Sequence, residues 1–365
     1  MLEDIDLRQL AELTGPERAF VSLYLSGPEA LQSLDNRIAK VRGLLSGEPA
    51  EVEHFEENLE RIKAWLSGYK FGSESICVFS CWALDYLEHF PLDVKVPDVL
   101  WVDSSPYIRP LAERKAEYER FVVVAADNKD TRIYLVTSEV LPEEHEARVK
   151  GDIKNHVKKG GWSQKRYARR RSNELLHYAK EVAEVLAEME QKEGFARILL
   201  LGSQETIAEI KGALPTALAE KVVGEKPVDL GAGTEQVFDE AFDLYFAEER
   251  ASEERLWERI KGEYMRGGLA VAGPEDVLEA AQYGRVESMI VTRDAKIAGT
   301  QCRDCEELSA GERTRCPECK SESVFKVDLV NELAQILALT GAVAEFADPL
   351  PGLSEVGDVA ALLRY

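Results

Sequence analysis

Residues 158–171 read KKGGWSQKRYARRR, so two glycines and a tryptophan lie inside a run of lysines and arginines. From Lys150 to Arg171 the chain carries nine basic residues and one acid, Asp152, which is a local charge of +8 (9 − 1). The whole chain of 365 residues has a formal net charge of -22. An acidic surface repels nucleic acid, whereas a local cationic segment attracts it. This asymmetry favours contact with a polyanion over a merely solvated helix face.

A long helix is predicted to follow this segment, over about residues 163–191. Its apolar positions repeat at intervals of four, three, four and three residues and therefore share one helical face; they are Leu175, Ala179, Val182, Leu186 and Met189. Ser163 is predicted as the N-cap of this helix. Cations near a helix N-terminus oppose the helix dipole, so a purely structural sequence would place acids there. Phosphate is the natural partner for the cations that stand there instead.

Outward from this segment, strand and helix signals are distributed along the whole chain and predict an α/β fold. The predicted strands are 20–25, 75–81, 121–126, 132–136, 197–201, 269–271, 286–292, 343–346 and 359–363, with an extended segment at 91–103. Further helices are predicted at 31–45, 50–66, 234–265 and 329–339, with two more around Ile207–Leu214 and from Pro274 to Tyr283. The segment GSQET (202–206) is interpreted as a plain strand-to-helix turn because it lacks the lysine and second glycine of a phosphate loop. Domains are predicted at 1–115, 116–265 and 266–365.

The overall composition is that of a globular protein with sizeable cores, since 45% of residues are hydrophobic and 31% charged. The sequence has no run of eighteen apolar residues, so no membrane span is expected. The first residues, MLEDIDLRQLAEL, have neither the basic region nor the apolar stretch of a signal peptide. A cytoplasmic location is expected.

Four of the six cysteines form two C-x2-C pairs, CRDC and CPEC, separated by ten residues. They are Cys302, Cys305, Cys316 and Cys319. Two such pairs supply the four thiolates of a tetrahedral zinc site with no open position, so a structural Zn²⁺ is predicted in a zinc ribbon at about 300–322. The spacing leaves iron open as the metal. Cys77 and Cys81 lie in an apolar strand and are interpreted as core thiols.

The segment GGWSQKRYARRR followed by a long helix resembles the central domain of the archaeal and eukaryotic class-one translation release factors. Their signature is Gly-Gly-Gln, then Ser and Arg-Phe-x-Arg-x-Arg at the start of a long helix. Gly160, Gly161 and Ser163 match it, as do the basic and aromatic positions Arg166, Tyr167, Arg169 and Arg171. The likeness covers the whole chain and extends to Pelota and to bacterial members of the superfamily. It implies a three-domain α/β architecture with a zinc ribbon inserted in the C-terminal domain.

The chain departs from the family where a release factor does its chemistry. The family's catalytic glutamine falls on Trp162. An indole has one N–H donor and no acceptor comparable to an amide oxygen, so Trp162 is not expected to place a water against the peptidyl-tRNA ester. Gln164, two residues further on, is the alternative catalytic residue; otherwise no catalytic residue is predicted.

The family's stop-codon reader is also missing. Release factors carry Asn-Ile-Lys-Ser in a helical hairpin, and here the corresponding tip reads SGEPAEVEHFEEN (46–58). Acidic side chains face mRNA phosphates unfavourably. Stop-codon reading is therefore not expected.

The resemblance and the residues together predict a translation factor that binds the ribosomal A site, in ribosome rescue or hibernation. The predicted RNA-binding residues are Lys158, Lys159, Gly160, Gly161, Trp162, Ser163, Gln164, Lys165, Arg166, Arg169, Arg170 and Arg171. Trp162 and Tyr167 are candidates to stack on bases, and the alternative for Trp162 is packing against its own domain. The expected partners are ribosomal RNA and, by resemblance, a translational GTPase. Two alternatives stay open: peptidyl-tRNA hydrolysis by Gln164, and binding of a free tRNA-like RNA.

Overall fold

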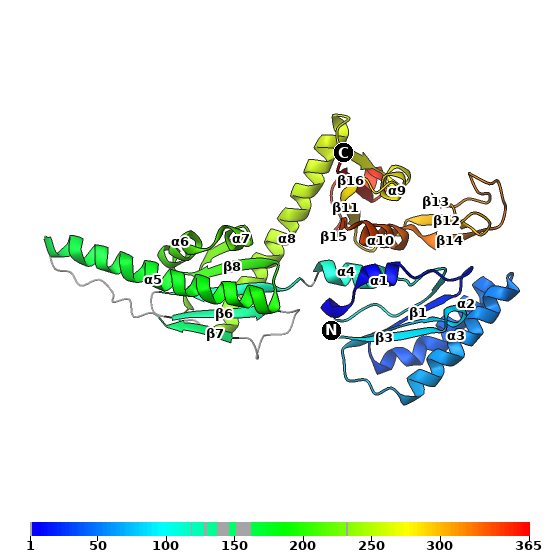
Figure 1. Ribbon diagram of the computed structural model, residues 1–365, viewed down its shortest axis with the longest axis horizontal. Coiled ribbons are helices and arrows are strands. Elements are labelled where there is room, and N and C mark those ends of the chain that lie inside the picture. Colours follow the sequence, from blue (N-terminus) through cyan, green and yellow to red (C-terminus); the bar gives the residue numbers. More distant parts are fainter. Residues whose placement is uncertain (1, 118, 128–129, 137–145, 151–161, 231–232) are drawn as a thin grey trace. The chain divides into compact units, whose positions relative to one another are not determined.

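The structure is a computed structural model of the chain. It describes residues 2–117, 119–127, 130–136, 146–150, 162–230 and 233–365, and only the backbone at residues 3, 146–150 and 162–172. The contacts divide the chain into two compact units (Figure 1): unit 1 is Met1–Glu117 with Glu253–Tyr365, and unit 2 is Tyr118–Ser252. The division into three domains at 1–115, 116–265 and 266–365 remains a prediction from the sequence, separate from these two units. Among the described helices, none is long and apolar enough to cross a membrane.

The N-terminal part of unit 1 is an antiparallel sheet of order β3-β2-β1-β4 with a helical hairpin packed on one face. Its elements are η1 (Leu2–Asp4), α1 (Leu7–Ala11), β1 (Phe20–Leu25), η2 (Pro28–Ser33), α2 (Leu34–Leu45), α3 (Pro49–Gly68), β2 (Ser75–Cys81), η3 (Trp82–Leu84), β3 (Tyr86–Leu92), β4 (Val99–Asp103) and α4 (Arg109–Glu117). The side chains of Val21, Leu23 and Leu25 alternate along β1 and pack with the hairpin. The predicted strands and hairpin are confirmed, and β3 is an addition.

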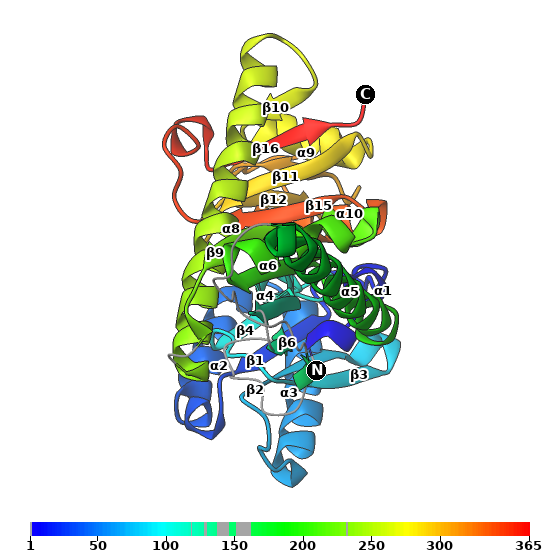
Figure 2. The ribbon, with the colours of Figure 1, turned by 90° about the vertical axis from the view of Figure 1, so that its left-hand side faces the viewer.

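The C-terminal part of unit 1 is a mixed sheet of order β10-β16-β11-β15, in which only β11 and β15 are parallel (Figure 2). Its elements are β10 (Ala270–Ala272), α9 (Pro274–Gln282), β11 (Val286–Thr292), α10 (Leu329–Thr340), β15 (Val343–Ala347), η5 (Ser354–Val356) and β16 (Val359–Leu363). Between β11 and α10 the chain forms a small antiparallel sheet of order β13-β12-β14, from β12 (Ala298–Cys302), β13 (Leu308–Ala310) and β14 (Val324–Asp328). Residues 298–328 are called the ribbon below.

Unit 2 is a mixed sheet of order β7-β6-β5-β8-β9 with helices on both faces. Its elements are β5 (Phe121–Ala126), β6 (Asp130–Val136), β7 (Glu146–Lys150), α5 (Trp162–Glu193), β8 (Arg197–Gly202), α6 (Gln204–Ala213), α7 (Thr216–Ala219), β9 (Val222–Pro227) and α8 (Thr234–Met265), whose second half belongs to unit 1. β5 is entirely buried, because α5 and α6 cover one face of the sheet and the first half of α8 covers the other. This confirms the interpretation of FVVVAA as a strand covered on both faces.

The turn after β8 is held by Gly202 and Ser203. Gly202 has a φ of 135°, and a Cβ there would lie 1.8 Å from the carbonyl oxygen of Ala126, so only glycine fits. Ser203 caps α6, its side chain accepting the N–H of Thr206 at 3.3 Å. This is the plain strand-to-helix turn predicted for GSQET.

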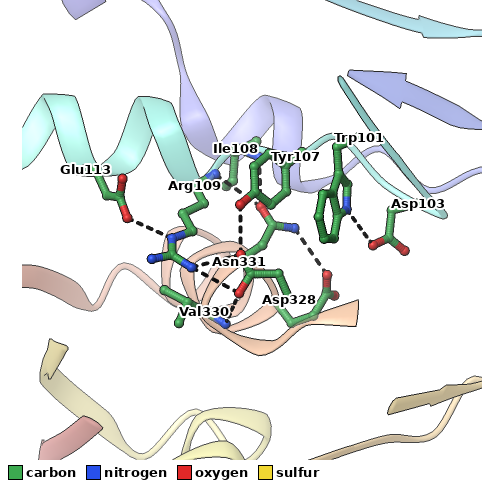
Figure 3. A network of polar contacts seen from close by, with 10 residues as sticks. Trp101, Asp103, Tyr107, Ile108, Arg109, Glu113, Asp328, Val330 and Asn331 are labelled. Carbon is green, nitrogen blue, oxygen red and sulfur yellow. Dashed lines mark hydrogen bonds and ion pairs between the residues drawn. The ribbon is translucent and has the colours of Figure 1, made fainter. Parts of the chain in front are cut away.

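A buried polar network joins the two parts of unit 1 at the start of α10 (Figure 3). The Asn331 side chain is fully buried, and its Oδ1 accepts the N–H groups of Ile108, at 2.8 Å, and Arg109, at 3.1 Å. Gln335, one turn further along α10, donates to Ser105 Oγ at 2.8 Å and to the carbonyl of Pro106 at 3.0 Å. α10 therefore supplies the hydrogen-bond partners that residues 105–109 need when they are buried.

Arg109 adds an ion pair to the same network. Its guanidinium lies 2.9 Å from Asp328 Oδ2 and 2.7 Å from Glu113 Oε1, and Tyr107 donates its hydroxyl to Asp328 at 2.8 Å. Asp328 also caps α10 by accepting the N–H of Val330. Because the Arg109 and Asp328 side chains are only 9% and 11% exposed, removing Arg109 would leave Asp328 buried without this counter-charge, whereas removing Asp328 would leave Arg109 with Glu113.

One arginine, Arg293, forms ion pairs at both ends of the insertion in unit 1: where the chain leaves the unit and where it returns. Arg293 follows β11, and its guanidinium lies 3.5 Å from Glu117, at the end of α4, and 4.0 Å from Glu253, within α8. It also pairs with Asp348 at 3.5 Å, and its backbone N–H donates to the carbonyl of Ala347. The last residue before unit 2 and the first after it are therefore fixed to one side chain.

Glu332, next to Asn331, is a buried acid in this network. Burial raises the pKa of Glu332 to about 8, and the neighbouring carboxylates of Asp103 and Asp328 act in the same direction. Its Oε1 accepts one hydrogen bond, from Asn331 at 3.2 Å. The side chain is therefore protonated at neutral pH in the folded chain and ionised in the unfolded chain.

We expect Glu332 to make unit 1 less stable as pH rises. Between its unfolded pKa, about 4.3, and its folded pKa, the folded state binds one more proton, so the free energy of unfolding falls by about 1.4 kcal/mol per pH unit. Glu332→Gln removes this titrating group. From pH 6 to 8 the free energy of unfolding of the variant should therefore fall less steeply than that of the wild type, by about 1.4 kcal/mol per pH unit. Urea unfolding at several pH values measures it. Equal slopes in the two proteins would contradict the assignment.

Candidate functional site

The four predicted metal ligands come together at the tip of the ribbon. The Sγ atoms of Cys302, Cys305, Cys316 and Cys319 all lie within 4.8 Å of one another. Two of the pairs, Cys302–Cys319 and Cys305–Cys316, are 3.5 Å apart, and all four cysteines are free of disulfides. Four thiolates at 2.3 Å from a tetrahedral Zn²⁺ would lie about 3.8 Å from one another. The observed spacing fits a tetrahedral metal ion held by four sulfurs.

Two backbone knuckles of the same design present these sulfurs. In each knuckle the N–H of the first cysteine donates to the carbonyl five residues later: Cys302 to Glu307 at 2.9 Å and Cys316 to Ser321 at 2.8 Å. The residue after the second cysteine has a left-handed backbone in both, with φ of 59° at Glu306 and 63° at Lys320. Each turn thus brings its two sulfurs to the same side.

A metal in this site would be structural. All four positions of a tetrahedral ion are taken by cysteines, so no coordination position remains for a water or a substrate. Cys302 and Cys316 are buried, and Cys305 and Cys319 are exposed. The structure brings the four predicted residues together in a cluster that could hold a metal ion.

The predicted RNA-binding segment lies at the start of α5. Lys158, Lys159, Gly160 and Gly161 lie outside the described residues. The remaining predicted residues stand in the first ten positions of α5, where only the backbone is described; they are Trp162, Ser163, Gln164, Lys165, Arg166, Arg169, Arg170 and Arg171. The helix begins at Trp162, so Ser163 stands inside it, and the prediction that Ser163 is the N-cap is wrong. Gln164 stands in the first turn, as predicted.

α5 is fixed to the unit 2 sheet through its later turns. Leu175, Ala179, Val182 and Leu186 are at most 1% exposed and pack with one face of the sheet, which confirms the predicted apolar stripe. The hydroxyl of Tyr178 hydrogen-bonds the Thr131 side chain of β6. In Figure 1 the basic start of α5 extends beyond the edge of the sheet. The fold thus anchors the helix behind its cationic end.

The helical hairpin tip is less negative than its sequence suggests. Glu51 is 1% exposed and pairs with Arg303 at 2.8 Å, and Glu56 receives two hydrogen bonds from Arg42. The hydrogen bonds from Arg42 lower the pKa of Glu56. Two of the acids of this tip are therefore compensated within unit 1. Arg303 was missed as a functional residue, and its position inside the CRDC motif, between two ligands, is the only signal the sequence gives.

Comparison with known proteins supports the resemblance seen in the sequence. Residues 106–244 match the family described as bacterial archaeo-eukaryotic release factor family 10. The chain is 26% identical over 290 residues to peptide chain release factor subunit 1 of Archaeoglobus fulgidus. The aligned region covers 72% of this chain and 70% of that protein. It is also 26% identical over 253 residues to the Pelota homologue of Pyrococcus furiosus, with coverage of 67% and 62%.

Among solved structures, one similar chain is S. cerevisiae Dom34, described as a translation termination-like factor that interacts with Hbs1. The match has 13% sequence identity and a TM-score of 0.41, and covers 77% of this chain and 73% of that one. The matches to families and relatives confirm the resemblance to the release factor and Pelota superfamily.

We expect one metal ion per chain, lost when a ligand is removed. Cys302→Ser and Cys316→Ser should each reduce the metal content to below about a tenth of the wild-type value, because three thiolates no longer close the site. Elemental analysis of the purified protein measures the content and separates zinc from iron. Cys77→Ala, which changes a buried thiol of β2, is the control and should retain the metal. Full metal content in either serine variant would contradict the site.

Proposed function

We propose that this chain is a ribosome-associated translation factor of the release factor and Pelota type, which enters the ribosomal A site and grips RNA through residues 158–171. The observation that carries the proposal is the start of α5: a helix that opens directly after two glycines, has no acid in its first turn and carries five basic residues by Arg171. Such a helix end gains little within the protein, because its charges oppose the helix dipole. It gains from phosphates, whose condensed counterions it displaces.

Two departures favour anchorage without hydrolysis. Trp162 stands where the family has its glutamine, and an indole cannot both donate to and accept from a water as an amide does. The hairpin tip at 46–58 lacks the family's codon-reading motif. Basic contacts to phosphate position a protein on RNA and survive when the chemistry is lost. We therefore propose a role in ribosome rescue or hibernation rather than in termination at stop codons.

The remaining parts of the proposal follow from the same resemblance. We propose three domains at 1–115, 116–265 and 266–365, a structural Zn²⁺ on the four cysteines, and delivery by a translational GTPase. A cytoplasmic site of action follows from the ribosomal partner.

A second candidate function is peptidyl-tRNA hydrolysis by Gln164. The observation that favours it is the place of Gln164 in the first turn of α5, two residues after Trp162. Opposing it, catalysis tolerates little misplacement of the reacting groups, and this amide lies two positions away from that of the family.

Reversing the charge at the start of α5 should weaken ribosome binding. With Lys165, Arg166 and Arg169 all changed to Glu, we expect at least a tenfold loss of affinity near 100 mM salt and a salt slope of log K that is shallower by roughly 2. Ribosome co-sedimentation at a series of salt concentrations measures both quantities. Lys192→Glu, at the other end of the same helix and 72% exposed, is the matched control and should bind as the wild type does. Equal binding by the triple variant would refute the proposal.

The unmodified protein should not release peptide. Stalled ribosome complexes carrying labelled peptidyl-tRNA, incubated with excess protein, should show release no faster than the uncatalysed rate, because Trp162 cannot orient the attacking water. Release that disappears in Gln164→Ala would instead establish the second candidate. Binding of isolated tRNA-like RNA as tightly as ribosomes would favour the free RNA-binding alternative.

A further inference from the structure

A groove of about 820 Å³ lies within unit 1, between the α2–α3 hairpin and the ribbon. Val41 and Leu44 of α2 line it from one side, and Leu100 of β4 forms part of its floor. Arg303 and Phe325 of the ribbon line it from the other side. Because the ribbon contributes these two side chains, the shape of the groove depends on where the ribbon lies.

Arg303 is the main polar contact between the ribbon and the hairpin. Its Nε and Nη2 donate to Glu51 Oε1 at 3.1 and 2.8 Å, and its Nη1 donates to the carbonyl of Val324 at 3.1 Å. The Arg303 side chain is 16% exposed and that of Glu51 2%. Breaking a pair this buried would leave Glu51 with only the more distant Arg18, at 3.7 Å, so the contact resists opening as long as Arg303 is held in place.

Phe325 and Arg18 complete the contact. The guanidinium of Arg303 lies 5.0 Å from the centre of the Phe325 ring, and that of Arg18 lies 5.4 Å from it. Arg18 precedes β1, lies 3.7 Å from Glu51 Oε2 and donates to the carbonyl of Val102 at 3.1 Å. The Phe325 ring thus contacts two guanidiniums, that of Arg303 in the ribbon and that of Arg18 just before β1. These contacts add cation–π attraction to the ion pair.

Arg303 lies next to the metal site. Arg303 directly follows the ligand Cys302, and its own N–H donates to the carbonyl of Ser323 at 2.9 Å, across the ribbon. Residues 303–323 read RDCEELSAGERTRCPECKSES, so besides cysteines they contain only Leu308 and Ala310 as apolar residues. Leu308 and Ala310 are buried in the core of the C-terminal part, so the two knuckles have little apolar surface of their own, and a bound metal would supply much of the free energy that orders them.

We propose that the ribbon is a metal-dependent wall of this groove, latched by the Arg303–Glu51 pair. With the metal bound, the first knuckle holds Arg303 against Glu51 and the ribbon closes one side of the groove. Without the metal, the knuckle loses its order, the latch opens, and Glu51, which is 1% exposed, becomes accessible to solvent together with the neighbouring residues of α3 and β4. Metal occupancy then controls a surface of the N-terminal part of unit 1 that no metal ligand touches.

Hydrogen exchange on the full-length, metal-loaded protein tests the latch. In Arg303→Gln and in Glu51→Gln we expect the amides of residues 49–55 and 99–102 to exchange at least tenfold faster than in the wild type, while metal content stays at one per chain. Arg315→Gln is the matched control, because Arg315 pairs with the exposed Glu322 within the ribbon, and it should leave these segments unchanged. Two variants on opposite sides of the pair guard against one that fails to fold.

Metal removal supplies the second arm of the test. Treating the wild type with a chelator should speed exchange in residues 49–55 and 99–102 as well as in the ribbon, and adding Zn²⁺ back should restore the original rates. The proposal is overturned if chelation speeds exchange in the ribbon alone, or if both latch variants exchange like the wild type with their metal bound.

Discussion

The architecture of unit 1 depends on one side-chain oxygen. Asn331 Oδ1 accepts two backbone N–H groups from residues more than 220 positions earlier in the chain, and the whole arrangement is buried. Two buried donors without an acceptor would cost roughly 1–3 kcal/mol each, a large part of the stability of a typical domain. The segment 104–109, which leads from the N-terminal sheet into α4, is therefore satisfied in its buried position only when α10 is in place. The ribbon, which leads directly into α10, is positioned by the same contact.

Much of the fold could be predicted because its strands and helices have strong periodic patterns. FVVVAA and RILLL are continuous apolar runs, and α8 begins and ends where its pattern predicts. The strands β3, β7 and β9 were missed, as were the three strands of the ribbon, β12, β13 and β14. β3, YLEHFPL, contains a proline and charged residues and lies at a sheet edge, where hydrogen-bonding along one side suffices. Edge strands bury less, so their sequences carry less of the alternation on which prediction rests.

The metal centre was predictable because its ligands are close in sequence, and their spacing alone limits the geometry. The contacts of Arg303 and Asn331 were not, because their partners lie more than 200 residues away and the residue types are ordinary surface types. A single polar residue says nothing about its burial until the fold brings its partner to it. The basic start of α5 lies between these cases: its composition indicates its chemistry, and the register of its helix had to come from the structure.

The ion pairs that Arg293 makes with Glu117 and Glu253 bear on how unit 2 is inserted into the chain. The chain leaves unit 1 after Glu117 and returns to it at Glu253, and both residues contact the Arg293 guanidinium. The two ends of unit 1 at this point therefore lie side by side, as they must when one domain is inserted into another. A few glycines could bridge the cut ends, and the remainder would still possess both its sheets, the ribbon and the buried asparagine. Residues 117 and 253 are therefore the two positions at which a chimera would join a different second unit to unit 1.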